Sequence, residues 1–250
     1  MPCGSFCSGE HSNRMIRKNL HSTVFLNKAG FTLLELMTAM TIGAVVMSGV
    51  FSTYFAQQKS YRIQQQMAGL QQNLRAAMYF IEREVRMAGC DPAGSAGAGI
   101  VTAQASLLRF TADFDGDGTI KPSEDITYSL YDSGGDGDMD IGRASGGGRR
   151  QPLALNIDSL DFRYIDKEGF LLDDDGNGNV TTSLKSIRSI QITIIARADR
   201  EDPEYSDTRS YYNLIDSINA ILPAQNDGFR RRRLATEILC RNLGLVGEER

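Results

Sequence analysis

The sequence predicts an α+β protein in which one long N-terminal α-helix packs on a C-terminal antiparallel β-sheet head. Three features of the 250-residue chain support this fold class. An apolar run extends from Phe31 to Phe55, an apolar stripe at helical spacing follows from Ile63 to Ala88, and alternation with a period of two begins at Ile100. The first two patterns are typical of a continuous helix, and the third is typical of β-strands.

The apolar run makes the first half of the predicted helix, residues 31–56, a candidate for crossing a membrane. About 20 apolar residues are enough to span a bilayer as a helix. Glu35 is the only charged residue between Phe31 and Phe55. Because a carboxylate is costly in lipid, we expect Glu35 to have an assigned partner.

The second half of the predicted helix, residues 57–89, is amphipathic. Its apolar residues recur every three or four positions: Ile63, Met67, Leu70, Leu74, Met78, Ile81, Val85 and Ala88. This spacing places them on one face of a helix, which should end near Gly89 because Asp91-Pro92 follows. The stripe suits either a coiled-coil dimer or packing on the head. Head packing is favoured because a half-buried sheet needs a covering layer.

The head, residues 100–250, is expected to contain short strands separated by loops rich in Gly, Asp and Asn. The predicted strands are Ser106–Thr111, Asp125–Leu130, Leu160–Ile165, Ile190–Ile195 and Leu234–Leu243. The charged segment Asp199–Tyr212 is predicted to be a surface excursion, and Asn213–Leu222 a short helix. Short alternating strands of this kind favour an antiparallel sheet with one buried face.

The junction between the leader and the apolar run carries a family resemblance. Lys28–Leu36 reads KAGFTLLEL, which resembles the cleavage site of type IV prepilins and type II secretion pseudopilins. The resemblance implies that prepilin peptidase cuts between Gly30 and Phe31 and methylates the new amine of Phe31. It also implies that Glu35 pairs with the N-terminal amine of a neighbouring subunit. An ordinary signal peptide has its apolar core before the cut, whereas here the core follows it.

The leader itself, residues 1–30, is long for a prepilin. Met15 is therefore expected to be the true start, with Arg17, Lys18 and Lys28 as its cytoplasmic positive flank. The upstream part contains Cys3, Cys7 and His11, which are too few ligands to make a convincing zinc site.

The order of the later segments is similar to that of a PilW-type minor pilin. The segments are GLQQNLRAAMYFIEREVRMAG, ITYSL, IDSLDFRYID and RRRRLATEILCRNLGL. The resemblance implies a subunit at or near the pilus tip that takes part in pilus assembly and so in cell adhesion and twitching motility. It implies an inner-membrane span with a periplasmic head, then an extracellular pilus. The implied partners are prepilin peptidase, other minor and major pilins, the inner-membrane assembly platform and the bilayer.

Two other functions remain open at this point. One is a minor pseudopilin of a type II secretion system, and the other is a membrane-anchored calcium-binding or sensor domain. An enzyme is not expected, because both histidines, His11 and His21, precede the cleavage site and leave no Ser-His or Cys-His pair. Nucleic acid is not expected as a partner, because the net charge is −4.

An acidic loop in the head matches the twelve-residue calcium loop. Asp113, Asp115 and Asp117 occupy the first oxygen positions, Thr119 supplies a backbone carbonyl, and Glu124 closes the loop. The predicted cofactor is therefore Ca²⁺. The alternative is a solvated hairpin loop in which Asp and Gly serve only the turn.

Two further expectations concern the end of the chain. Cys90 and Cys240 survive the predicted cleavage, and a pair of cysteines in an oxidising compartment permits a disulfide. The basic run Arg230–Arg233 fits either a contact with DNA or anionic lipid, or a strand whose alternate side chains are solvated or paired with acidic loops. The strand is favoured because no aromatic residues are interleaved with the arginines.

Overall fold

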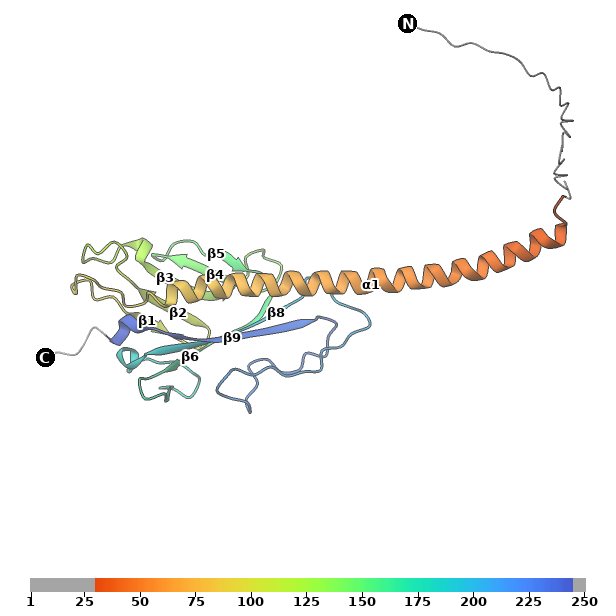
Figure 1. Cartoon of the computed structure of the whole chain (residues 1–250). Coiled ribbons are helices and arrows are strands. Elements are labelled where there is room, and N and C mark those ends of the chain that lie inside the picture. Colours follow the sequence, from red (N-terminus) through yellow and green to blue (C-terminus); the bar gives the residue numbers. More distant parts are fainter. Residues whose placement is uncertain (1–29, 245–250) are drawn as a thin grey trace, which may run out of the picture. The chain divides into compact units, whose positions relative to one another are not determined.

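The computed structural model describes residues 30–244, so the predictions for the leader before Gly30, including those for Cys3, Cys7, His11 and Met15, lie outside the described residues. The chain forms two compact units, Met1–Phe55 and Ala56–Arg250. One long helix, α1 (Leu33–Val85), contributes to both units. Nine strands follow it in the described part of the chain, all within the second unit (Figure 1). The α+β fold class predicted from the sequence is confirmed.

Helix α1 begins with a reciprocal pair of hydrogen bonds. Glu35 N donates to Thr32 Oγ1 at 3.2 Å, and Thr32 N donates to Glu35 Oε2 at 3.0 Å. This is the capping-box arrangement, which satisfies two amides that the first turn would otherwise leave free. At its other end, the helical hydrogen bonds give way to turn hydrogen bonds that span three residues, such as the one from Met87 N to Glu84 O. The helix has ended before Gly89.

The head contains two antiparallel sheets, where the sequence indicated one. Sheet A has the order β1-β2-β3-β4-β5, and sheet B has the order β7-β6-β8-β9. The strands of sheet A are β1 (Ile100–Ala103), β2 (Leu107–Thr111), β3 (Asp125–Tyr131), β4 (Asp140–Ser145) and β5 (Gln151–Ala154). Those of sheet B are β6 (Ile157–Ile165), β7 (Leu171–Leu172), β8 (Ser189–Arg197) and β9 (Arg231–Leu239). Figure 1 shows both sheets beside the second half of α1.

One hydrophobic core joins that half of α1 to both sheets. Helix residues Leu70, Leu74, Met78, Ile81 and Val85 are buried in the same cluster as side chains from both sheets. The contributions from the sheets include Leu108, Phe110, Ile126 and Tyr128 of sheet A, and Leu160, Phe162, Ile190 and Ile192 of sheet B. The predicted stripe therefore packs on the head of its own chain, as the interpretation from helical spacing favoured.

The segment between β8 and β9 differs from its prediction in two ways. Residues 213–222 form no helix. Asn213 Oδ1 accepts from the amides of Ile215 and Asp216, and such side-chain bonds compete with helical hydrogen bonding. The Asp199–Tyr212 excursion is also not wholly at the surface, because Asp202 and Asp207 are buried.

Candidate functional site

The start of α1 holds the residues that the sequence assigned to processing and assembly. Gly30 lies just before the helix, and the Phe31 side chain is 91% exposed. Glu35 Oε2 accepts both the amide and the hydroxyl of Thr32, each at 3.0 Å. For Glu35 Oε1, no hydrogen bond is present within residues 30–244. One carboxylate oxygen thus caps the helix while the other stays available to a group from outside.

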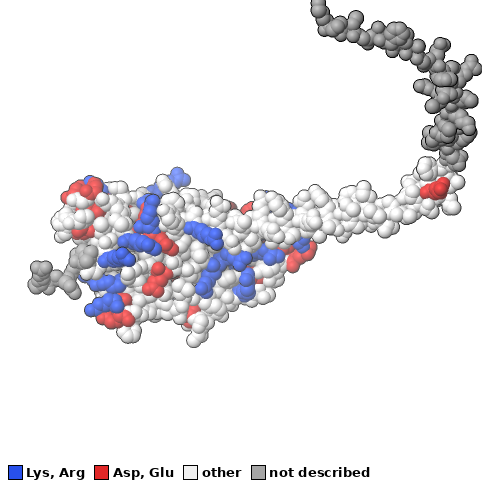
Figure 2. All heavy atoms as spheres, in the orientation of Figure 1, with Lys and Arg blue, Asp and Glu red and all other residues white. Residues whose placement is uncertain are grey.

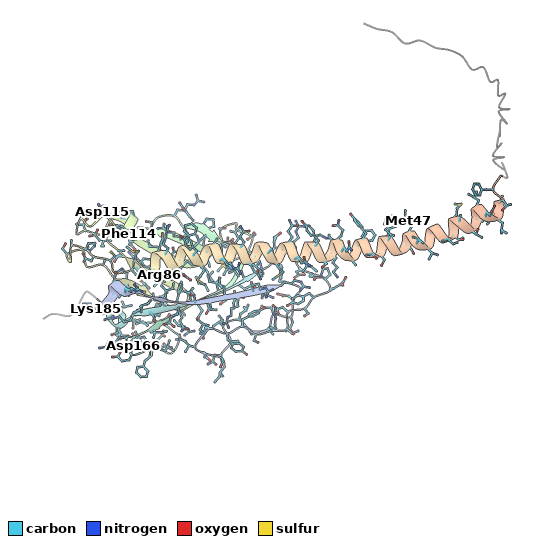
Figure 3. All side chains as sticks on the ribbon, viewed as in Figure 1. Met47, Arg86, Phe114, Asp115, Asp166 and Lys185 are labelled. Carbon is cyan, nitrogen blue, oxygen red and sulfur yellow. The ribbon has the colours of Figure 1, made fainter. Side chains whose placement is uncertain are left out.

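The apolar half of the helix leaves almost no polar group on its surface. Side chains project on all sides of the helix around Met47 (Figure 3), and those from Phe31 to Phe55 are exposed. Apart from one acidic patch at its start, this half carries no charge (Figure 2). By length and composition α1 is able to cross a membrane.

Several hydroxyls of this half are satisfied within the helix. Four of them donate to carbonyls three or four residues earlier: Thr38 to Glu35, Thr41 to Thr38, Ser48 to Val45 and Thr53 to Gly49. In an apolar medium every polar group must find its partner internally. This half of α1 is therefore suited to lipid or to an apolar bundle of helices.

The acidic loop before β3 brings together three of its five predicted calcium ligands. Carboxylate oxygens of Asp113, Asp115 and Asp117 lie within 4.8 Å of one another. Asp113 is fully buried, and its two oxygens accept from the amides of Gly116 and Gly118 at 2.7 and 2.9 Å. The loop is thus folded around the Asp113 carboxylate.

The remaining residues of this loop do not complete the calcium site. Both Glu124 oxygens are occupied by amides, at 2.8 Å from Phe114 N and 2.8 Å from Lys121 N. The Lys121 ammonium bridges Asp115 and Asp117. Its hydrogen bond to Asp117, together with those of Thr119, lowers the pKa of Asp117 to about 2. Thr119 contacts Asp117 through its hydroxyl, at 2.7 Å. The Lys121 ammonium thus neutralises Asp115 and Asp117, the role that a bound Ca²⁺ would otherwise have.

The predicted disulfide is not formed in the structure, where Cys90 and Cys240 are both free. Cys240 follows β9 and is buried, with its Sγ 3.7 Å from Val85 O at the end of α1. Burial raises the pKa of this thiol to about 12. Cys240 therefore fastens the last strand to the helix end as a buried thiol.

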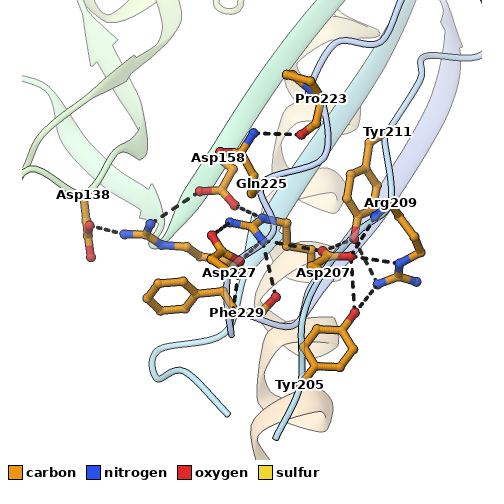
Figure 4. A network of polar contacts seen from close by, with 12 residues as sticks. Asp138, Asp158, Tyr205, Asp207, Arg209, Tyr211, Pro223, Gln225, Asp227 and Phe229 are labelled. Atoms are coloured by element: carbon orange, nitrogen blue, oxygen red, sulfur yellow. Dashed lines mark hydrogen bonds and ion pairs between the residues drawn. The ribbon is translucent and has the colours of Figure 1, made fainter. Parts of the chain in front are cut away.

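Figure 4 shows a network of polar contacts at the edge of sheet B that includes Asp158, Asp207 and Asp227. The basic run Arg230–Arg233 joins this network through Arg231. Arg231 is 3% exposed and pairs with Asp158 and Asp227, each at 2.5 Å, and with Asp207 at 3.5 Å. Hydrogen bonding to Arg231 lowers the pKa of Asp227. The three carboxylates come from β6 and from the segment between β8 and β9, so the network fastens that segment to the sheet.

The neighbouring arginines do not alternate in their surroundings. Arg230 pairs with Asp202 at 2.7 Å and lies over the ring of Tyr205, whereas Arg232 is exposed. Arg233 is also exposed, so paired and solvated arginines are adjacent along the run, whereas the strand interpretation predicted that they alternate. Asp158 and Asp207 could not be named as partners from the sequence, because they lie far from Arg231 along the chain, whereas Asp227 is only four residues away.

A polar cluster between α1 and sheet A escaped the sequence analysis. The Glu84 carboxylate accepts from the Tyr128 hydroxyl and from Arg143 Nε at 2.9 Å. Burial, with the nearby Glu84 charge, raises the pKa of Tyr128. From the sequence, Glu84 would be assigned to the solvent-exposed face of the helix. The one indication that it is partly covered is its position next to the buried stripe residues Ile81 and Val85.

The comparisons with known proteins concern mainly the start of the chain. Residues 26–51 match the family described as the prokaryotic N-terminal methylation motif. The chain has a type IV prepilin-like N-terminus. The matched range includes Gly30, Phe31 and Glu35 together with most of the apolar half of α1.

Solved structures similar to this chain include a type IV-like pilin. This pilin comes from Thermus thermophilus, is 16% identical, covers 70% of this chain and 96% of its own, and gives a TM-score of 0.46. No curated protein matches the chain.

Proposed function

We propose that the chain is a minor pilin, processed by prepilin peptidase, that takes part in type IV pilus assembly at or near the tip. The observation that carries the proposal is the methylation motif, which lies at the start of a helix with an exposed apolar first half. The PilW-like order of segments supports the choice of a minor pilin over a shaft subunit.

In the proposed mechanism, cleavage after Gly30 frees the amine of Phe31, which the peptidase then methylates. Before assembly the apolar half spans the inner membrane, with the head in the periplasm. During assembly the amine of one subunit meets Glu35 of its neighbour inside an apolar bundle. A charge in such surroundings must be paired, so this contact sets the axial register of the filament.

Mass spectrometry of the mature N-terminus tests the proposal directly. The expected mass is that of residues 31–250 with a methylated amine on Phe31. A Gly30→Val variant should keep its leader and reduce piliation. A native chain that retains its leader and never enters a filament would contradict the proposal. Normal function of the unprocessed variant would favour the membrane-anchored sensor.

The role of Glu35 needs a control, because its carboxylate also caps the helix. Glu35→Ala removes both roles, whereas Thr32→Ala removes the hydroxyl contacts of the cap and keeps the carboxylate. We expect incorporation into filaments, measured by immunoblot of sheared pili, to be lost in Glu35→Ala and largely retained in Thr32→Ala. Equal losses in both variants would show that Glu35 acts as a cap.

Filament type is a separate question. A minor pseudopilin of a type II secretion system would also be cleaved and methylated. Deletion of the gene should abolish piliation and leave secretion of exported enzymes intact. The reverse pattern would identify the pseudopilin.

Calcium binding by the head is a second proposal, supported by the three carboxylates of Asp113, Asp115 and Asp117. A bound ion would have to displace the Lys121 ammonium. Lys121→Ala should therefore bind Ca²⁺ more tightly than the wild type in isothermal titration calorimetry, and Asp117→Asn more weakly. If neither the wild type nor Lys121→Ala binds Ca²⁺, the loop is a turn stabilised by lysine.

A further inference from the structure

An open hollow of about 780 Å³ lies on the face of sheet A. Its floor is formed by Leu107, Thr127 and Ala144, and its wall by Tyr131 and the loop 146–150 that follows β4. None of these residues belongs to the sites proposed above. Two features bear on what the hollow could bind.

The first feature is a buried hydroxyl without a partner. Ser129 is 5% exposed, and its Oγ makes no hydrogen bond within the described residues. On β3 it lies between Thr127 and Tyr131, and across the strand pair it faces Leu107. Alternate residues of a strand share a face, so Ser129 is on the same side as these three lining residues. Ser129 is not itself a lining residue, and its hydroxyl is covered, so a ligand in the hollow must be held by other groups.

The second feature is an unbalanced positive charge. Arg149 and Arg150 are exposed, and neither pairs with a carboxylate in the described part of the chain. Arg109 also lines the hollow, but Asp125 holds it at 2.6 Å. Asp132, the acidic group in the lining, turns toward its own loop and accepts from the amides of Gly135 and Gly137 at 2.6 and 2.9 Å. Two guanidinium groups are therefore left for a ligand.

The ring of Tyr131 is already in contact with other residues, which disfavours a ligand that would bind by stacking on it. A Cβ on Gly142 would lie 2.6 Å from the Tyr131 ring, so the ring rests on this glycine. The guanidinium carbon of Arg150 lies 5.9 Å from the ring centroid. With these two contacts the ring has little face free for stacking on a sugar. Recognition at this hollow must depend on charge and hydrogen bonds.

We propose that the hollow binds an acidic peptide segment, with its carboxylates on Arg149 and Arg150. Arginine forms paired hydrogen bonds with carboxylates and is well suited to this role. The hollow is open, so one small anion would stay largely solvated, whereas a segment with several carboxylates gains from simultaneous contacts. This inference does not depend on the filament function.

The proposal is tested with a fluorescein-labelled hexaglutamate peptide and the detergent-solubilised mature protein, by fluorescence anisotropy. The double variant Arg149→Gln/Arg150→Gln should weaken binding at least tenfold. Its matched control, Arg200→Gln/Arg232→Gln, removes the same charge from exposed arginines elsewhere and should change the affinity less than twofold.

Other probes provide the outcomes that would overturn the proposal. Equal binding of a hexaglutamine peptide would remove the role of charge. Equal weakening by the control double variant would reduce the effect to overall charge. Preferential binding of trigalacturonate would identify the ligand as an acidic glycan instead. Displacement of the peptide by an equal concentration of inorganic phosphate would identify a site for small anions.

Discussion

The two halves of α1 belong to one continuous helix but find their partners in different places. From Leu70 to Val85 the helix places one stripe of side chains in a core shared with both sheets. From Phe31 to Phe55 its side chains are apolar around the whole circumference and exposed. A stripe is suited to a single surface, whereas an apolar circumference is suited to an apolar surrounding on every side. The first half therefore requires lipid or other subunits, and the second half requires only its own chain.

The largest effect expected from this contrast is at two isoleucines of the same helix. Ile81 is 0% exposed and Ile42 is 66% exposed. Ile81→Ala leaves a cavity between α1 and the sheets and should lower the free energy of unfolding of the head by about 3 kcal/mol. Ile42→Ala should leave it unchanged. Urea denaturation of the mature protein in detergent micelles, followed by far-UV circular dichroism, measures both.

Similar destabilisation by the two isoleucine variants would contradict the division of α1 into two environments. Loss of filament incorporation in Ile42→Ala, with its head stability intact, would show that the first half is packed only in the assembly.

A smaller effect is expected at the polar cluster that joins α1 to sheet A. Glu84→Gln keeps the shape of the side chain but removes the charge that holds Arg143 and Tyr128. Hydrogen bonds to charged groups contribute about 1.5–3 kcal/mol, so we expect a loss of about 2 kcal/mol. The control is Glu82→Gln, since Glu82 meets only Arg86 at 3.4 Å on the helix surface and should change stability by less than about 0.5 kcal/mol. Equal losses of unfolding free energy in the two variants would argue against a role of this cluster in holding α1 on sheet A.

The first half of α1 should respond to its cap more than to any packing contact. Thr32→Ala removes the hydroxyl of the capping box and should cost about 1 kcal/mol of helix stability, confined to the first turn. Thr38→Ala removes a hydroxyl that donates back to Glu35 O and should have a smaller effect. Amide exchange measured by NMR in micelles reports on both, and uniform protection of the first turn in Thr32→Ala would refute the role of the cap.

The smallest expected effect is a dependence of stability on pH. Low pH should weaken the ion pairs of the head and leave its apolar contacts unchanged. Arg231 lowers the pKa of Asp227, and Arg230 lowers that of Asp202. An unfolded aspartate has a pKa of about 3.9, so the stabilisation is complete above this pH and is lost as the pH falls through the lower folded values. The segment 199–230 should loosen in acid before the helix stripe does, because the stripe does not titrate.

The near-UV circular dichroism of tyrosine measures this transition, since the chain has no Trp and Tyr205 and Tyr211 lie in the network. Asp227→Asn should reduce the acid transition, and Asp199→Asn, at an exposed position, should not. An unchanged transition in Asp227→Asn would place the acid sensitivity elsewhere.

The sequence predicted the elements whose pattern is set by one buried face. Leu70, Leu74, Met78 and Ile81 were found from their spacing, and the central strands β3, β6 and β8 were found from alternation. Strands β4 and β5 were missed because they contain Gly142 and Pro152, which weaken the local strand signal. Segment 213–222 was predicted as a helix because its amphipathic residues hid the turn-forming role of Asn213 and Asp216.

The candidate site divides in the same way. Gly30, Phe31 and Glu35 are neighbours in the sequence, so their motif is readable without a fold. The contacts of Arg231 with Asp158 and of Glu84 with Arg143 form only when the fold brings distant segments together, and no local sequence pattern predicts the register that does so. The acidic loop is an intermediate case. Its carboxylates are close together in the sequence and could be grouped from it, but their ion pair with Lys121 could not be predicted.

The back-bonded hydroxyls of Thr38, Thr41, Ser48 and Thr53 bear on how this chain tells one neighbour from another. With their donors already committed to the helix, these side chains have no hydrogen to give to an adjoining molecule. Recognition along this part of the helix then depends mainly on the shape of its aliphatic and aromatic groups, and Glu35 is its one charged side chain. Shape alone discriminates poorly between similar apolar helix surfaces. Selectivity between neighbouring molecules would therefore have to come mainly from the heads.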